Sequence, residues 1–432
     1  MSQAAALSHL MDAVQTLPNS LTTYIISIIA TYLTGVWGLS IVSVAVIVNL
    51  YSGIVGILPL GLKFIVDAFI GNYWIVLLSR LAFTAGFVLL TLSTPSVLSW
   101  ESGLSFLTVD SPPPESEPFK RPQSDDSEEN NRAGFFCEAP LAGALILFVP
   151  LVSFLVIGSY QPQPRAERSL VKHILKRKHA RSILFLVPIS ITFILLGVVS
   201  SIGNTFFIEQ AVDMNHYVGS LWVPLLILPI FQHSYKKKKP LNCGIHPKLG
   251  IAFSMICAIL SCITAAKVET RRLGVVTSQG VIDEPEKIIP MTMFWLLPQF
   301  ALLGVSEAIS EKNITDFFTN ELALERNDDE ATKASKRKHM EFLAQALSGV
   351  GMICGLVLVY IVRKATAANG GTSWFQNTLN TSRLDNYYWT LATLSAANLV
   401  FFLVVISVHH ICSESRSVED EQRSSSTVPL IA

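Results

Sequence analysis

The sequence predicts an all-α protein that crosses a membrane many times. Ten apolar stretches account for nearly half of the 432 residues, and most of them are long enough to cross a hydrocarbon core that requires about 20 residues per helix. Half of the residues are hydrophobic, only 15% are charged, and the mean hydropathy is +0.47. Because water-soluble domains do not have this composition, we interpret the chain as an integral membrane protein.

The apolar stretches define ten expected spans. They lie at residues 21–36, 41–64, 73–93, 139–160, 183–203, 220–234, 249–266, 290–310, 341–362 and 386–411. The first two form one apolar block that is too long for a single crossing, and we divide it at residues 35–38, where two glycines interrupt it. The N-terminus has no basic segment or cleavage site typical of a signal peptide, so we expect the chain to insert through its own spans.

The basic residues alternate between connections, as the positive-inside rule requires. Residues 161–182 carry seven Lys and Arg, residues 204–219 carry none, and the tetralysine 236–239 follows the sixth span. Another basic cluster lies at residues 326–338, two crossings later. With ten spans, this alternation places both termini in the cytoplasm.

Four segments between or after the spans are polar. Residues 101–138 are rich in Pro, Ser, Asp and Glu and are expected to form a disordered outer loop, because they bury too little apolar surface to fold. Residues 267–287 and 363–383 are expected outer loops with a few basic residues, and the second contains a glycosylation sequon at Asn380. The tail, residues 412–432, is expected to be disordered.

Several function classes leave no mark in the sequence. There is no GxxxxGK[ST] phosphate loop, no soluble segment long enough for an ATPase domain, and no cluster of acid, base or metal-ligand side chains. Six scattered cysteines and nine histidines show no metal-ligand spacing. We therefore expect no enzyme, no cofactor, no metal and no nucleic-acid partner, and secondary transport of a small solute through the bilayer remains as the default.

Three segments of the second half resemble one known family. They are residues 203–210 (GNTFFIEQ), residues 289–300 (IPMTMFWLLPQF), and the third segment with its motifs at 373–375 and 382–389; residues 32–35 and 67–73 of the first half match in pieces. The chain resembles the plant nitrate and peptide transporter family, within the proton-dependent oligopeptide transporters and the major facilitator fold. Members of that family have twelve spans, and the acidic loop here stands where the fourth and most of the fifth would be.

The chain departs from the family where the family couples transport to protons. Members carry an E-x-x-E-R motif at the first span, whereas this chain has Gln15, Pro18 and Asn19 at the corresponding positions. Asn72 replaces a common arginine, and Ser200 stands where some nitrate-transporting members have histidine. The resemblance therefore implies that the usual route of proton coupling is absent.

Glu307 is the one carboxylate expected inside a span, and ionisable groups in spans are functional candidates by default. It resembles the acidic pocket position of the family. If its helix continues to Phe318, Glu307 lies near the middle of the membrane and faces a central cavity; if the helix stops near Ser310, Glu307 is a solvated residue at the helix end.

Weaker polar candidates for substrate binding are Asn204, Gln210 and Gln299. For each of them a hydrogen bond between helices explains the residue at least as well as contact with a solute. The aromatic residues Tyr387, Tyr388 and Trp389 open the last span, where we expect them to form a belt at the membrane interface.

These observations predict an incomplete N-terminal bundle (1–160), a basic cytoplasmic linker (161–182), a C-terminal bundle of six helices (183–411) and a cytoplasmic tail (412–432). The expected function is transport of nitrate, small peptides or a similar solute across the plasma or vacuolar membrane by alternating access. Because one bundle is shortened, two alternatives stay open. The chain is then either a transport-inactive relative that associates with itself or with related transporters, or an incomplete gene product.

Overall fold

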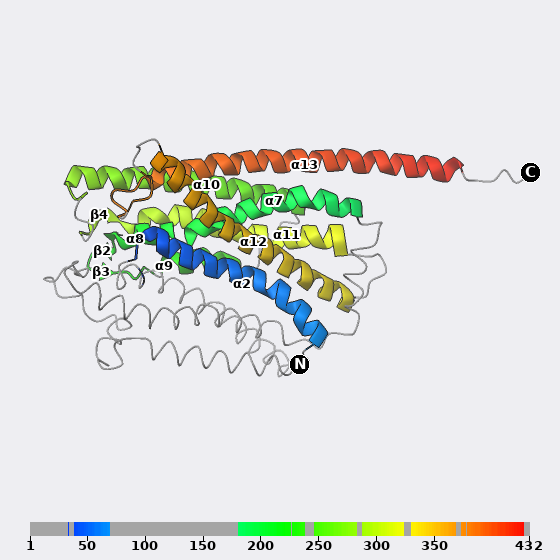
Figure 1. Cartoon of the computed structure of the whole chain (residues 1–432), viewed down its shortest axis with the longest axis horizontal. Helices are drawn as coiled ribbons and strands as arrows, with labels where there is room; N and C mark the ends of the chain where they lie inside the picture. The colour runs from blue at the N-terminus through cyan, green and yellow to red at the C-terminus, as the bar shows by residue number, and fades with distance from the viewer. Residues whose placement is uncertain are drawn as a thin grey trace, which may run out of the picture.

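The computed structural model describes residues 33, 39–69, 180–225, 227–237, 246–282, 287–323, 330–368, 373–376 and 378–426 (Figure 1). Several predicted features lie outside the described residues. They are the spans at 73–93 and 139–160, the acidic loop 101–138, most of the first span and of the basic linker, and the positions of Gln15, Pro18, Asn19 and Asn72.

Helices dominate the described part of the chain. They are α2 (Ile41–Phe69), α7 (Ala180–Gly203), α8 (Phe206–Val212), α9 (Ile227–Lys237), α10 (Pro247–Gln279), α11 (Leu297–Phe318), α12 (Glu330–Ala367) and α13 (Leu384–Ser426). A 3-10 helix η2 (Met293–Leu296) precedes α11, and a π-helical turn η3 (Thr319–Ala323) follows it. Within these residues, six segments are long and apolar enough to cross a membrane: Val42–Gly61, Leu186–Val212, Pro247–Gln279, Met293–Leu322, Lys336–Ala367 and Leu384–His409.

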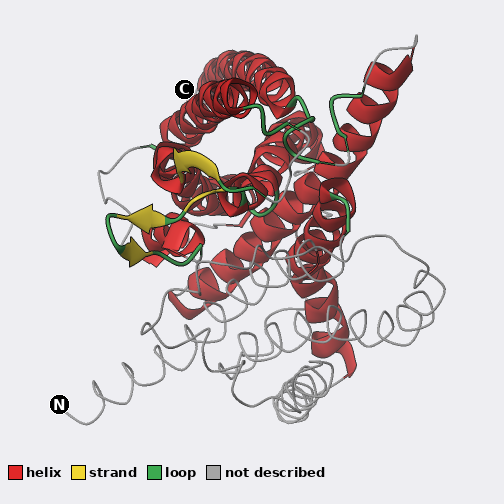
Figure 2. Cartoon of the chain, turned by 90° about the vertical axis from the view of Figure 1, so that its left-hand side faces the viewer, coloured by secondary structure: helices red, strands yellow, loops and turns green. Residues whose placement is uncertain are grey.

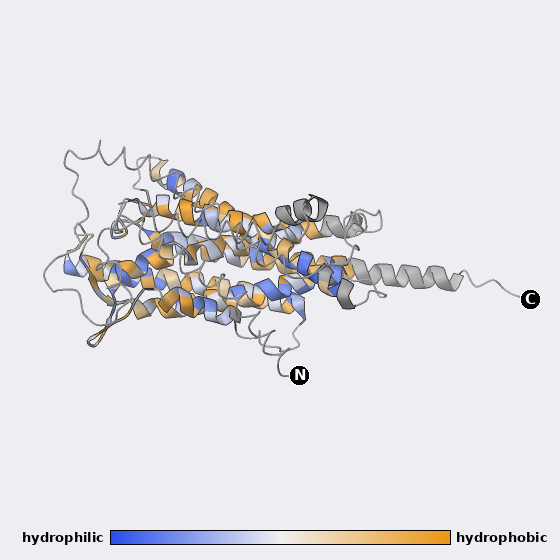
Figure 3. Ribbon diagram, turned by 90° about the horizontal axis from the view of Figure 1, so that it is seen from below, coloured by the Kyte–Doolittle hydropathy of each residue, from blue (hydrophilic) through white to orange (hydrophobic). Residues whose placement is uncertain are grey.

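Two short sheets lie together at one end of the helices, which we call the outer end (Figure 2). Strand β1 (Met214–Asn215) pairs in parallel with β4 (Ile289–Thr292), and β2 (Tyr217–Val218) pairs antiparallel with β3 (Leu221–Trp222). Gly219 has a φ of +65° in the two-residue turn between β2 and β3, where glycine avoids the strain of a side chain. The helices run side by side away from this end, with hydrophobic residues along most of their length (Figure 3).

Helix α12 lies between α2 and α7 and contacts both at glycines. A Cβ atom added to Gly349 would lie 2.6 Å from the Gly53 carbonyl oxygen of α2, and one added to Gly197 of α7 would lie 2.5 Å from the Ser348 carbonyl oxygen. Such close approach of two backbones is possible only without side chains, as is common in membrane helix packing. Helix α2 belongs to the first half of the chain and α12 to the second, and their contact is the main one between the two halves among the described residues.

The structure corrects three boundaries of the predicted spans. Helix α10 does not end near Ala266 but continues to Gln279, where Gly280 with a φ of +67° caps it, so the expected outer loop 267–287 is mostly helical. The expected span 220–234 is a hairpin strand followed by the 11-residue α9, which is about 16 Å long and therefore too short to cross a bilayer alone. Residues 204–212, expected as a loop, continue the α7 span as α8.

The expectation of a disordered tail is also wrong. Helix α13 continues through the tail to Ser426 and extends beyond the other helices in Figure 1. Residues 412–426 contain no proline or glycine, so nothing stops the helix that the preceding apolar span has already nucleated. Pro429 is the first residue in the tail that disfavours helix.

Aromatic side chains fill the core between these helices. Phe193 of α7 makes edge-to-face contacts with Phe317 and Phe318 at the end of α11, with ring centroids 6.1 and 5.6 Å apart. Tyr387 and Tyr388 of α13 are fully buried, so the expected interfacial belt is wrong for both, whereas Trp389 is exposed. The two tyrosines face the core because α8 supplies ring partners, Phe206 for Tyr387 and Phe207 for Tyr388.

Candidate functional site

Glu307 lies at the middle of α11, because this helix continues to Phe318. The structure therefore confirms the first of the two predicted helix lengths, and Glu307 is not a residue at a helix end. Its side chain is half-buried, and the Gln232 side chain of α9 donates a hydrogen bond to its carboxylate at 3.2 Å. Gln232 was not among the predicted residues.

Two glycines leave room for Gln232 to lie close to α7 and α11. A Cβ atom added to Gly304 would overlap the Gln232 carbonyl group, and one added to Gly203 at the end of α7 would lie 3.3 Å from the Gln232 amide nitrogen. Gln232 is 1% exposed. The neighbouring Ser306 faces the other side, where its hydroxyl donates to the Ser254 carbonyl of α10. Glu307 thus lies on the α9 side of α11, and its contact with a central cavity remains a prediction.

The weaker candidates are not beside Glu307. Asn204 is half-buried in the turn between α7 and α8. Gln210 and Gln299 are fully buried, and the Gln299 amide donates to Gln210 at 3.2 Å. Gln299 precedes Glu307 by eight residues, or about 12 Å along a helix axis. The two glutamines therefore belong to a different part of the bundle, where they connect helices.

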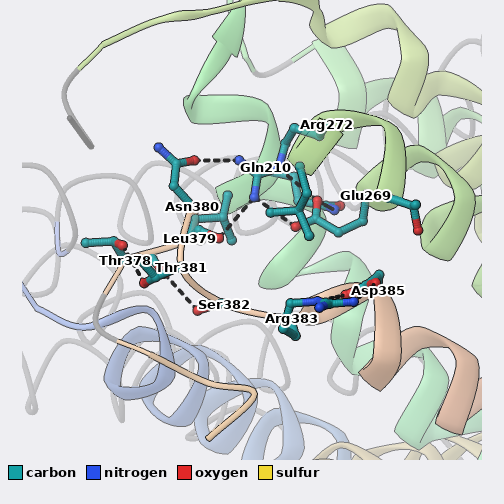
Figure 4. Close-up of polar contacts among 12 residues, drawn as sticks. Gln210, Glu269, Arg272, Thr378, Leu379, Asn380, Thr381, Ser382, Arg383 and Asp385 are labelled. Carbon is teal, nitrogen blue, oxygen red and sulfur yellow. Dashed lines mark hydrogen bonds and ion pairs between the residues drawn. The ribbon is translucent and has the colours of Figure 1, made fainter. Parts of the chain in front are cut away.

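The two glutamines are hydrogen-bonded to a buried ion pair at the outer end, Gln210 directly and Gln299 through Gln210. Arg272 donates from Nε and Nη2 to the two carboxylate oxygens of Glu269, each at 2.8 Å, and both side chains are 0% exposed. The Gln210 amide donates to Glu269 at 2.5 Å. Arg272 also donates to the Asn380 side chain at 2.8 Å and to the Leu379 carbonyl at 3.0 Å (Figure 4). We call Gln210, Glu269, Arg272, Gln299 and Asn380 the outer polar cluster.

Sequence reasoning missed the centre of this cluster, because it placed residues 267–287 in a loop outside the membrane. Glu307 is therefore not the only carboxylate inside a span, since Glu269 lies in the Pro247–Gln279 segment. The spacing of Glu269 and Arg272 by three residues, which puts both on one face of a helix, was the signal available. Arg272 donates hydrogen bonds to Glu269, to the Asn380 side chain and to the Leu379 carbonyl, so we interpret the pair as structural.

Asn380 is buried in this cluster rather than exposed in an outer loop. It is 6% exposed, and its amide oxygen accepts the bond from Arg272. The segment that follows is fixed as well: Arg383 donates to both carboxylate oxygens of Asp385 at 3.0 and 2.9 Å. This hydrogen-bonded partner raises the pKa of the exposed Arg383 guanidinium, which stays charged. The folded protein therefore does not present Asn380 as an accessible acceptor for a glycan.

Comparison with solved structures gives the same fold. The chain superposes on an auto-inhibited peptide transporter of the POT family with a TM-score of 0.50 and 12% identity, covering 88% of this chain and 94% of that one. It superposes on a mutant of the nucleoside transporter NupG with a TM-score of 0.51 and 15% identity, covering 91% and 98%. Long helices in this arrangement and buried polar groups inside spans define a multi-pass membrane protein of the major facilitator fold.

Sequence relatives then define the family. The protein named NRT1/PTR FAMILY 5.5 from Arabidopsis thaliana is 28% identical over 509 aligned positions, which cover 90% of this chain and 94% of the relative. NRT1/PTR FAMILY 5.12 of the same plant is 29% identical over 243 positions, covering 52% of this chain and 42% of the relative. No family model matches the chain. The chain is similar to the NRT1/PTR family of membrane transporters over most of its length, as its sequence motifs indicated.

Proposed function

We propose that the chain moves a small solute across the membrane by alternating access, and that Glu307 contacts this solute. The observation that carries the proposal is the position of Glu307 at the middle of a membrane-spanning helix, half-buried beside Gln232. A carboxylate at this depth is costly and is retained where it serves a polar pathway. Similarity to the family supports transport as the activity, and it equally supports the absence of an enzymatic reaction.

The charge of Glu307 favours one kind of solute. In a medium of low dielectric constant, a carboxylate attracts an amino group and repels an anion such as nitrate more strongly than it does in water. Ser200, which replaces the histidine of some nitrate-transporting members, is 8% exposed in α7 and offers a hydroxyl group without positive charge. We therefore propose a solute with a free amino group, such as a dipeptide or tripeptide, ahead of nitrate.

We further propose that the chain forms two unequal helical bundles, residues 1–160 and 183–411, joined by a basic linker, in a plant plasma or vacuolar membrane. The alignment with the first relative supports a shortened chain, because it is longer than the chain itself and so leaves relative residues without a counterpart. The five spans and the short α9 between residues 180 and 411 support the second bundle.

Uptake into proteoliposomes tests this function. Purified full-length chain should take up labelled dipeptide more than labelled nitrate, and uptake should not respond to a pH gradient, because Gln15, Pro18 and Asn19 replace the coupling motif. The Glu307→Gln variant should lose most dipeptide uptake while keeping its folded monodisperse profile. Glu311→Gln is the matched control, since Glu311 lies one turn later on α11 and is exposed.

Each outcome separates the parts of the proposal. Unchanged uptake by Glu307→Gln would refute the role of Glu307, and accumulation driven by a pH gradient would refute the loss of coupling. No uptake of any solute by well-folded protein would favour the second candidate, a transport-inactive relative that associates with full-length transporters. The missing residues in the alignment are the observation behind that candidate. Sequencing of transcripts across residues 101–138 tests whether the chain is an incomplete gene product.

A further inference from the structure

Helix α10 has one face that no other helix covers. The helix packs against α11 and α13, and on its remaining side four large apolar residues are 42–65% exposed. These residues are Leu249, Phe253, Ile256 and Leu260. Their spacing of four, three and four residues places them on one line along the helix. In a membrane protein an exposed apolar line of this kind contacts the acyl chains of lipids.

The same line becomes cationic towards the outer end. Eighteen residues make five full turns of an α-helix. Lys267 lies eighteen residues after Leu249 and therefore on the same line. Arg271 lies about one turn further along it, eighteen residues after Phe253. Both basic side chains are exposed, so the face that contacts acyl chains ends in two positive charges.

The distance along α10 places these charges at the level of lipid headgroups. At the other end of the helix, Lys248 forms an ion pair with Glu321 at 3.7 Å and marks where α10 leaves the hydrocarbon core. At 1.5 Å per residue, Lys267 lies about 29 Å and Arg271 about 35 Å further along the helix axis. A hydrocarbon core is about 30 Å thick. The two cations therefore lie where the core ends and the phosphate groups begin.

The protein does not neutralise these two charges. Neither Lys267 nor Arg271 forms a hydrogen bond or an ion pair with a residue that the structure describes. Glu269 lies between them in the sequence, but its side chain is fully buried and is bonded to Arg272. Two positive charges about 5–6 Å apart thus remain available to an anion from the lipid side.

Trp295 orients Arg271 for such an anion. The guanidinium carbon lies 4.0 Å from the centroid of the Trp295 ring, and this ring is 42% exposed in η2. Contact with the ring uses the flat face of the guanidinium group and leaves the N–H groups at its edge free for bidentate bonds to a phosphate. Gly274, about one turn beyond Arg271, leaves the surface open, because an added Cβ would have no heavy atom within 4 Å.

We propose that the outer end of α10 binds the phosphate group of one anionic phospholipid. Arg271 binds two phosphate oxygens, Lys267 adds a second positive charge, and Trp295 holds the guanidinium group in place. The acyl chains of the same lipid lie along the apolar line from Leu260 towards Leu249. This site is on the outside of the bundle and does not depend on the transported solute or on Glu307.

Native mass spectrometry of the full-length chain in an uncharged detergent tests the site. The chain is titrated with phosphatidylglycerol or phosphatidylcholine of equal acyl length, and the dissociation constant of the first bound lipid is measured. Wild type should bind phosphatidylglycerol several-fold more tightly, because the choline group offsets the phosphate charge. In the variant Lys267→Gln with Arg271→Gln, phosphatidylglycerol should bind roughly thirty-fold more weakly, since each basic residue near an anionic lipid contributes about fivefold.

The variant Arg363→Gln with Lys364→Gln is the matched control. It removes the same charge from exposed residues near the end of α12, but these two neighbours do not share one line along their helix. Binding of phosphatidylglycerol should weaken by less than about threefold, because distant exposed charges are screened. All four substitutions replace exposed side chains, so both variants should keep a monodisperse profile.

Three results would overturn the proposal. The first is unchanged binding of phosphatidylglycerol by the α10 variant. The second is an equal loss in the α12 variant, which would show a response to net charge alone. The third is displacement of the lipid by glycerol phosphate at the same concentration, because the apolar line would then contribute nothing and the ligand would be a soluble anion.

Discussion

Removal of Arg272 should destabilise the protein far more than removal of the arginine beside it. In Arg272→Met, the flexible apolar side chain fills much of the same volume but supplies no charge and no donor. Glu269 would then be a buried carboxylate without its bidentate partner, and the Leu379 carbonyl and the Asn380 amide oxygen would each lose a donor. The variant therefore tests whether the outer polar cluster depends on this one cation.

The expected cost follows from the burial of both partners, each 0% exposed. Loss of one partner of a buried ion pair typically costs about 3–5 kcal/mol, because an uncompensated charge stays in a medium of low dielectric constant. At about 1.4 kcal/mol per factor of ten, this lowers the folding equilibrium between about a hundred-fold and several-thousand-fold. Arg271→Met is the control, since Arg271 is exposed and lies 4.0 Å above the Trp295 ring. It should lose only about 0.5–1 kcal/mol.

Unfolding of purified variants in mixed detergent micelles, followed by size-exclusion chromatography, measures both free energies. The double variant Glu269→Met with Arg272→Met should be more stable than Arg272→Met alone, because it removes the unpaired carboxylate together with the cation. The reasoning fails if Arg272→Met costs no more than Arg271→Met. It fails equally if the double variant is less stable than the single one.

Two further predictions concern a glycine contact and the sequon. Gly304→Ala should lower the free energy of unfolding by about 1–3 kcal/mol, because the added methyl group overlaps the Gln232 backbone. Gly274→Ala on α10 should raise it by up to about 1 kcal/mol, because no heavy atom lies within 4 Å of the added Cβ. Equal effects of the two substitutions in thermal unfolding would contradict this prediction. Chain expressed in plant or oocyte membranes should show the same gel mobility with and without endoglycosidase, and Asn380→Gln should not change it, because Asn380 is buried against Arg272. A mobility shift abolished by Asn380→Gln would show that the sequon is used.

The membrane class, the helical fold and the approximate place of most spans were predictable from the sequence, as the agreement at α2, α7, α11, α12 and the first part of α13 shows. The family was also predictable, because its motifs in the second half are specific. The failures share one cause, which is that hydropathy alone was used to place the ends of the helices. Hydropathy ended α10 at its first charged residues, kept residues 220–234 as a span because they are apolar, and treated the polar tail as disordered.

The candidate site was predictable only in part. The place of Glu307 in its helix came from the family resemblance, and its partner Gln232 comes from α9, 75 residues away in the chain. Gln210 and Gln299 were named as candidates, but the sequence does not show that they bond to each other and to a buried ion pair. Pairings between distant helices follow from packing, which a pattern along one helix does not contain.

By itself, then, the amino-acid sequence determined that this chain forms membrane helices, because lipid offers no hydrogen bonds to the backbone and only a helix of sufficient apolar length satisfies its own. Only the tertiary structure decided which polar residues lie inside. Whether Glu269 and Arg272 are exposed in a loop or buried in a core depends on the partners that Gln210, Leu379 and Asn380 bring to them. A charge is costly in lipid when it is alone and tolerated when it is paired, and pairing is a property of the fold.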